Sequence, residues 1–230
     1  MKLSCIACFV AISFAFLRNV SGQAFVNLDF ENATIVPDPS SSYYPYAVYT
    51  SDAIPGWAVT GNFLGPNDIL YNDLALGAPS VAILGMNGAP SIGVPGALDG
   101  AFSIDLYGGA GPSTGVSITQ TELVPTSANS LLFEAQPGFG AVTGSLVVSL
   151  GGQNISILAI ATGPNYTLYG GNIPSVFAGQ SEQLIFSALA GNNNYWEIDD
   201  IQFSTSSVPE PSTLGLLVLG GLLFTFRRSN

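Results

Sequence analysis

Phe102-Ser-Ile-Asp-Leu-Tyr107 alternates apolar and polar side chains. Successive side chains of a β-strand point to opposite faces of its sheet, so this period of two is typical of a strand with one face against a core. The same period continues at Val116, Ile118 and Gln120. No long stretch shows the 3.6-residue period of an amphipathic helix. The pattern therefore predicts an all-β domain.

Similar short runs recur along the middle of the chain, separated by clusters of Gly, Pro and Asn. They occur at residues 25–30, 130–135, 145–150, 154–160, 183–188 and 197–203. The Gly151-Gly152 pair between two runs is a hairpin signal. Residues 43–100 are rich in Pro and Gly, and we expect long loops carrying short strands there. Roughly eight to ten strands in one domain predict an antiparallel, jelly-roll-like sandwich.

Basic side chains are confined to the two ends of the chain. The sequence has 4 Lys and Arg residues, no His and 15 acidic residues, and none of residues 23–208 is Lys, Arg or His. A surface of carboxylates without cations cannot replace the counterions of a phosphate backbone, so we do not expect nucleic-acid binding. The same argument excludes attraction to anionic lipid headgroups.

The side chains that most enzymes use for catalysis are missing from the middle of the chain. Both cysteines, Cys5 and Cys8, precede residue 23, so no disulfide, thiolate metal site or Cys nucleophile is expected in the domain. Without His or Lys, a Ser-His-Asp triad, a Ser-Lys dyad and a P-loop are excluded. A carboxylate pair, as in glycoside hydrolysis, remains. No spacing among the acidic residues selects such a pair, so we expect a non-enzymatic protein.

The N-terminus has the layout of a secretory signal peptide. Lys2 precedes the apolar stretch Ile6–Leu17, and Val20-Ser-Gly22 supplies small residues before a cleavage site. We expect signal peptidase to cleave after Gly22, with Ala24 as a second possible site. A retained membrane anchor is the alternative, but the apolar run is short for a membrane span.

The C-terminus has three parts: Val208-Pro-Glu-Pro211, the apolar stretch Leu214–Phe226, and Arg227-Arg228. As a helix the apolar stretch would reach about 20 Å, which is less than the ~30 Å hydrocarbon core of a membrane. The arginine pair would stop transfer and stay on the cytoplasmic side. The expected organisation is a signal peptide (1–22), an ectodomain (23–203), a polar spacer (204–207) and a C-terminal segment with a short apolar helix (208–230).

This tail resembles the PEP-CTERM sorting signal of bacteria that make exopolysaccharide. The residues that match its motif are Pro209, Glu210 and Pro211, and Arg227 and Arg228 match its basic end. The resemblance implies that an exosortase recognises the tail, and that the protein is anchored only transiently in the inner membrane. It would end in the cell envelope or the extracellular matrix.

Other tails share parts of this layout. An ordinary tail anchor remains an alternative. A GPI-anchored protein is another, because Asn32, Asn154 and Asn165 begin glycosylation sequons, but a GPI tail normally ends apolar. A sortase signal would need Leu-Pro-x-Thr-Gly, which the tail does not contain.

Four segments of the middle domain are similar to galactose-binding-like carbohydrate-binding modules. They are Asn27-Leu-Asp-Phe-Glu31, Pro55-Gly-Trp57, Leu146–Gln153 and Trp196–Phe203. The resemblance implies a β-sandwich whose first and last strands lie together and share a structural calcium ion. By this resemblance Glu31 would face Asp199 or Asp200 across the calcium site. Solvated strand ends are the alternative for these carboxylates.

Aromatic residues gather in the first part of the domain, and they offer faces on which sugar rings could stack. The cluster comprises Tyr43, Tyr44, Tyr46, Tyr49 and Trp57. Packing in the core or in loops is the alternative. The sequence thus favours an exported, non-enzymatic envelope or matrix protein that associates with exopolysaccharide. A glycosidase-like carbohydrate-active enzyme, a detached binding module and a purely structural or adhesion protein are the alternatives.

Overall fold

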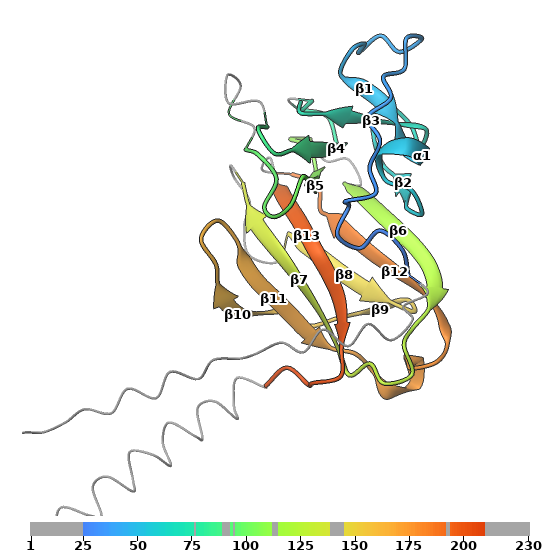
Figure 1. The fold of residues 1–230 in the computed structure, drawn as a ribbon, viewed down its shortest axis with the longest axis vertical. Helices are drawn as coiled ribbons and strands as arrows, with labels where there is room; N and C mark the ends of the chain where they lie inside the picture. The colour runs from blue at the N-terminus through green and yellow to red at the C-terminus, as the bar shows by residue number, and fades with distance from the viewer. Residues whose placement is uncertain are drawn as a thin grey trace, which may run out of the picture.

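The structure is a computed structural model that describes residues 25–75, 77–88, 93, 95–111, 115–138, 145–191 and 194–209. Strands dominate it (Figure 1). They are β1 (Ala47–Tyr49), β2 (Ala58–Thr60), β3 (Asp68–Tyr71), β4 (Ser80–Gly85), β5 (Phe102–Tyr107), β6 (Val116–Leu123), β7 (Ser130–Pro137), β8 (Leu146–Leu150), β9 (Gln153–Asn154), β10 (Leu158–Thr162), β11 (Thr167–Asn172), β12 (Ser181–Ala188) and β13 (Tyr195–Ser204). The described helices are α1 (Thr50–Ala53) and a 3-10 turn at Ser175–Phe177. No helix of the described residues has the length and apolar character needed to cross a membrane.

The strands form two sheets that pack face to face. The larger sheet has the order β1-β3-β4-β5-β13-β7-β11-β10, and the smaller has the order β2-β6-β12-β8-β9. Every pair is antiparallel except β3 and β4, which run parallel. The predicted antiparallel sandwich is therefore confirmed. The thirteen strands of the described residues exceed the expected eight to ten, because residues 43–100 contribute four of them.

The main core lies between the two sheets, where the alternating side chains meet. Ile104 and Leu106 of β5 point inward and are fully buried, as the sequence pattern predicts. The rings of Phe133 and Phe186 meet there edge to face, with their centroids 5.1 Å apart. Burying each large apolar side chain contributes about 1.5–3 kcal/mol, so this layer supplies most of the stability of the fold.

A second, smaller core covers part of the outer face of the larger sheet. Leu70, Ala82 and Leu84 are buried there. Loop residues around Phe63 and Leu74 pack over them. The segment 43–100 therefore adds strands to one end of the larger sheet and also covers its outer face (Figure 1).

The predicted first strand at residues 25–30 is wrong. This segment forms turns, in which Asn27 and Phe30 have positive φ values of 52° and 55°. A side chain takes the place of a neighbouring strand: the amide of Gln120 accepts a hydrogen bond from the Val26 N–H (2.7 Å) and donates one to the Val26 carbonyl (3.0 Å). Phe25, Leu28 and Phe30 are still buried, whereas Val26 is exposed, so the pattern identified most of the core residues but not their backbone conformation.

The hairpin predicted at Gly151-Gly152 is present, with φ values of 57° and 75° at the two glycines. The run 154–160, predicted as one strand, is divided between the two sheets. Its start belongs to β9 in the smaller sheet, and Leu158 begins β10 in the larger sheet. A short apolar run therefore crosses from one layer of the sandwich to the other.

The segment predicted as a polar spacer is bound to the domain. Asn129 donates a hydrogen bond to the Thr205 carbonyl (2.6 Å), and Ser130 donates one to the Ser206 carbonyl (2.7 Å). Val208 is buried, and its N–H donates to Asn172 Oδ1 (2.7 Å). The folded unit therefore extends to Val208.

Candidate functional site

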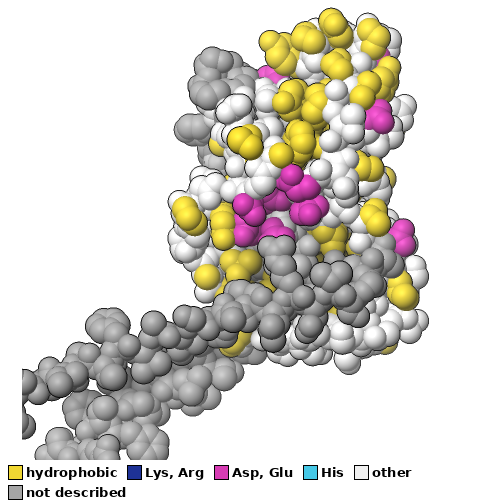
Figure 2. Space-filling model, viewed as in Figure 1, with side chains coloured by type: hydrophobic (Ala, Val, Ile, Leu, Met, Phe, Trp, Pro, Cys, Tyr) yellow, Lys and Arg dark blue, Asp and Glu magenta, His cyan; other side chains and the backbone are white. Residues whose placement is uncertain are grey.

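Three exposed tyrosines project from the loop before β1. Tyr43, Tyr44 and Tyr46 are 44%, 59% and 51% exposed. They are the only exposed Tyr, Trp or Phe side chains among the residues that the structure describes. This end of the domain carries a dense group of apolar side chains in Figure 2. Because these exposed rings share one loop, the loop is a candidate interaction site.

Hydrogen bonds hold the tyrosine loop in shape. Asp38 accepts hydrogen bonds from the Ser40 N–H (2.8 Å) and from the Tyr49 hydroxyl (3.1 Å). The hydroxyl of Ser40 also donates to Asp38, and the hydrogen bonds from Ser40 hold the pKa of Asp38 below its ordinary value. The Asp38 N–H in turn donates to the Ala47 carbonyl (2.9 Å). A loop fixed in this way loses little conformational entropy when a ligand binds.

The five predicted sugar-contact aromatics divide into three groups. Tyr43, Tyr44 and Tyr46 are on the surface, and Tyr43 also packs edge-on against Phe63 (4.9 Å between centroids). Tyr49 is half-buried, and its hydroxyl supports Asp38.

For Trp57 the prediction of sugar contact is wrong. Only 5% of this side chain is exposed, and its indole N–H donates to the Asn27 carbonyl (3.0 Å). Its ring packs near Phe30 and Phe186 in the main core. The Pro-Gly-Trp sequence fits a buried indole as well as an exposed one.

The predicted calcium ligands lie near one another but are already engaged. Glu31 Oε1 accepts hydrogen bonds from the N–H groups of Ala101 (2.7 Å) and Phe102 (3.0 Å). Asp199 Oδ2 accepts one from the Asp99 N–H (3.3 Å). Glu31 and Asp199 thus hold the same segment, residues 99–102.

The first segment does lie beside the last strand, because the Ile201 N–H donates to the Leu28 carbonyl (3.0 Å). Within the described parts of the chain, however, no three His, Cys, Asp or Glu side chains are grouped to hold a metal ion. Calcium binding by Glu31 with Asp199 or Asp200 therefore stays a prediction.

Carboxylates gather in the middle of the face shown in Figure 2. Among the carboxylates of the domain, Glu134 and Asp199 are buried, and Asp200 and Asp99 lie close enough to act on Glu134 electrostatically. Burial raises the pKa of Asp199 to about 8, although backbone hydrogen bonds from Asp200 and Asp99 oppose the shift. Burial also raises the pKa of Glu134. Asp199 therefore holds a proton near neutral pH.

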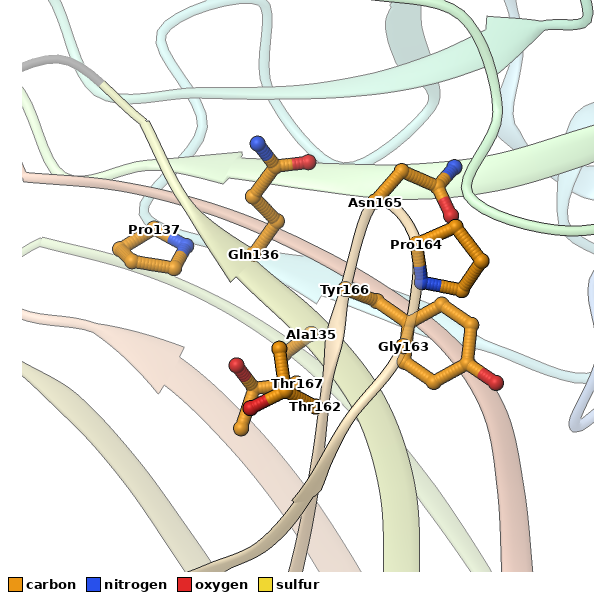
Figure 3. Close-up of a pocket in the computed structure, with 9 residues that line it drawn as sticks. All are labelled: Ala135, Gln136, Pro137, Thr162, Gly163, Pro164, Asn165, Tyr166 and Thr167. Carbon is orange, nitrogen blue, oxygen red and sulfur yellow. The ribbon is translucent and has the colours of Figure 1, made fainter.

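A shallow hollow of about 210 Å³ lies beside this acidic group (Figure 3). The end of β7 (Ala135 to Pro137) and the tip of the β10–β11 hairpin (Thr162 to Thr167) line it. Asn165 of the hairpin tip is fixed by a hydrogen bond to the Leu98 carbonyl (2.8 Å). The lining side chains are uncharged, and one of them, Tyr166, is hydrogen-bonded to Glu134.

Sequence reasoning missed a second acidic pair, Asp105 and Glu197. These side chains face each other on the outer face of the larger sheet, where both are fully buried. The Ser103 hydroxyl donates to Glu197 Oε1, while both oxygens of Asp105 have no hydrogen-bond partner. The alternation in 102–107 places Asp105 on the outer face, but nothing in the sequence indicates that this face is covered.

The sorting residues begin where the described structure ends. Pro209 is the last described residue, and Glu210, Pro211, Arg227 and Arg228 lie outside the described residues. The predicted signal peptide (1–22) and the predicted C-terminal apolar helix also lie outside them and stay predictions. Residues 207–229 match the family model of the PEP-CTERM protein-sorting motif.

The chain carries a PEP-CTERM sorting motif. It is therefore an exported protein that is anchored transiently in the membrane, is processed by exosortase and reaches the cell surface. The predicted sorting and localisation are confirmed in this form. No curated protein sequence matches the chain.

Two solved structures resemble the fold. TmCBM61, solved in complex with β-1,4-galactotriose, has 11% sequence identity and a TM-score of 0.39, and the match covers 80% of this chain and 99% of that one. A Stig cyclase from Fischerella sp. TAU, solved in complex with a pyrrolidinylidene-indole, has 18% identity and a TM-score of 0.41. That match covers 77% of this chain and 93% of the cyclase.

Proposed function

We propose that this surface protein binds exopolysaccharide through Tyr43, Tyr44 and Tyr46, and that it catalyses no reaction. The observation that carries the proposal is the confinement of all exposed aromatic rings of the described residues to one hydrogen-bonded loop. Tyrosine faces give a large contact area with a sugar ring, and their hydroxyls can bond to sugar hydroxyls.

The charge of the domain limits which polysaccharide fits. None of residues 23–208 is cationic, and 14 of the 15 acidic residues lie in this span. Polymers bearing carboxylate, sulfate or phosphate would be repelled without a compensating basic group. We therefore propose an uncharged polysaccharide as the ligand.

The buried carboxylates support a non-enzymatic role. Asp105 and Glu197 have no solvent-exposed surface, so a substrate cannot reach them in this conformation. A general acid must lie within hydrogen-bond reach of the bond that it cleaves. Hydrolysis of an exopolysaccharide by the purified protein would contradict this part of the proposal.

The test is a binding measurement with the host's own exopolysaccharide and with uncharged and acidic polysaccharides. Tyr44→Ala and Tyr46→Ala should each weaken binding to the uncharged polymer about tenfold, the equivalent of roughly 1.4 kcal/mol. Val176→Ala is the matched control, because Val176 is 67% exposed and belongs to the 3-10 turn. Equal binding by all three variants would contradict the proposed site. Stronger binding to the acidic polymers than to the uncharged ones would contradict the proposed ligand class.

A further inference from the structure

The larger sheet ends in an unprotected edge at β10. Figure 1 shows this strand at the margin of the sandwich, with only β11 beside it. Ala159, Ile160, Ala161 and Thr162 are all exposed, and the strand contains neither charge nor proline. An edge strand presents a row of unpaired N–H and C=O groups to which another strand can add.

The other three edges of the two sheets are much shorter. β1 and β2 have 3 residues each, and β9 has 2, whereas β10 has 5. The edge of β1 is also covered, because Pro37 forms a bridge with Val48. Short or covered edges are the usual protection against unwanted strand pairing. Only β10, among the described edges, combines length with an uncharged, exposed surface.

We propose that β10 pairs with β10 of a second copy of this chain and joins two larger sheets into one continuous sheet. A strand that pairs with its own copy about a two-fold axis must run antiparallel to it. Its main-chain hydrogen bonds need no particular side chain, and small residues such as Ala159 and Ala161 do not obstruct the approach.

Charge favours a second copy at this edge. The protein has a net charge of -11, yet none of residues 135–181 is charged. Counting inward from the β10 edge of the larger sheet, the first carboxylate is Glu134 on β7, and β11 lies between β7 and β10. Across a joined sheet the two Glu134 residues would be about 24 Å apart, since strands are spaced about 4.8 Å, and this exceeds the Debye length of ~8 Å. Two acidic molecules can therefore approach through β10 without strong repulsion.

A bulge at Ile160 limits the strength of the contact. Ala159 pairs with Tyr169 and Ala161 pairs with Leu168, so Ile160 is the extra residue. A bulge increases the local twist and interrupts regular pairing. The contact should therefore be a reversible dimer whose population depends on concentration.

The experiment is sedimentation equilibrium of the protein purified from the producing cells, over a wide range of concentration. Wild type should show a monomer–dimer equilibrium. Ala161→Glu should weaken dimerisation at least about tenfold, because it adds a carboxylate from each copy to the joined edge. Val176→Glu makes the same charge change at an exposed site outside the strands and should leave the equilibrium unchanged.

Cross-linking gives an independent measurement. The described residues contain no cysteine, so Ala161→Cys introduces one at the edge, and Val176→Cys is its control. A short bis-maleimide cross-linker, which tolerates different registers, should link two copies of the first variant through residue 161 and should not link the second. Mass spectrometry of the linked peptide identifies the product. A wild-type protein that stays monomeric at all concentrations would overturn the proposal. Equal effects of Ala161→Glu and Val176→Glu would also overturn it.

Discussion

Asp105 and Glu197 lie directly opposite each other on β5 and β13, and neither side chain is exposed to solvent. The described residues contain no Lys, Arg or His that could neutralise them. Two carboxylates facing each other across a strand pair repel, and a buried charge without a partner is costly. Burial raises the pKa of Glu197 to about 7, and burial together with Glu197 raises that of Asp105 well above its usual range. The pair therefore holds protons in the folded state near neutral pH.

The first prediction is that the free energy of unfolding falls as pH rises. Unfolded carboxyl groups titrate near pH 4, whereas Glu197 titrates at about 7 and Asp199 at about 8 in the folded protein. Between these values the folded state binds more protons than the unfolded state, so the stability present below pH 4 is lost as pH rises to 8. Glu197 alone accounts for about 3 kcal/mol of this loss. Urea denaturation at pH 5 and pH 8.5 measures the change, and a flat profile would contradict it.

The second prediction separates the charge of Asp105 from its shape. Asp105→Asn keeps the size of the side chain, removes the negative charge and supplies an amide donor for the unpaired Oε2 of Glu197. We expect this variant to be more stable than wild type at pH 8.5 by about 1–3 kcal/mol and little changed at pH 5. Asp68→Asn, a half-buried carboxylate on β3, is the control and should not flatten the pH profile to the same extent.

The sequence predicted the layers of the sandwich better than the environment of its outer face. Alternation at Phe102–Tyr107 correctly assigned Ile104 to the inner face and Asp105 to the outer face. It could not show that the outer face is covered, because the covering residues, such as Phe63 and Leu74, come from loops without a regular period. Side-chain period identifies which residues share a face, and only tertiary packing decides what that face contacts.

The aromatic site shows the same limit. Tyr44 and Trp57 were equivalent candidates from sequence, since both lie in a segment rich in Gly and Pro. The structure separates them because Trp57 has a buried hydrogen-bond acceptor in the Asn27 carbonyl, whereas the Tyr44 ring lies in solvent. Burial of a large ring depends on contacts with residues distant in sequence, such as Phe186, which no local motif records.

The third prediction uses this difference. Trp57→Ala should destabilise the domain by about 3–5 kcal/mol, because it opens a cavity in the main core and leaves the Asn27 carbonyl without its donor. Tyr44→Ala should change stability by less than about 0.5 kcal/mol, as expected for an exposed side chain. Thermal and urea denaturation measure both. If the Trp57→Ala protein kept its stability and lost only glycan binding, Trp57 would contact the sugar after all, contrary to its burial.

The fourth prediction concerns calcium. If calcium binds Glu31 with Asp199 or Asp200, it should raise the melting temperature, and a hundredfold excess over its dissociation constant adds about 2.7 kcal/mol. Because Asp199 has a pKa of about 8, the ion must displace a proton, so the effect should grow between pH 6 and pH 9. Glu31→Gln keeps an acceptor for the Ala101 and Phe102 N–H groups but removes the charge, and it should abolish the effect.

The matched control for calcium is Glu122→Gln on β6, which should leave the calcium effect intact. Melting curves that coincide with calcium and with chelator would exclude the ion as a stabilising ligand. A calcium effect that survives Glu31→Gln would place the ion elsewhere.

The fifth prediction is that the Pro-Glu-Pro segment is a sorting address and that the apolar tail is removed. The described domain reaches the start of the Pro-Glu-Pro segment: Asn172 exchanges hydrogen bonds with Val208, and Pro209 follows at once. Cleavage beyond Pro209 would therefore leave the hydrogen bonds between Asn172 and Val208 intact. As a helix, Leu214–Phe226 would reach about 20 Å and span a ~30 Å core poorly, so it suits a temporary anchor.

Intact-mass measurement of the surface protein should find Arg227 and Arg228 missing. Glu210→Ala should keep the tail and hold the protein in the inner membrane, and a wild-type mass that still includes Arg228 would refute the address.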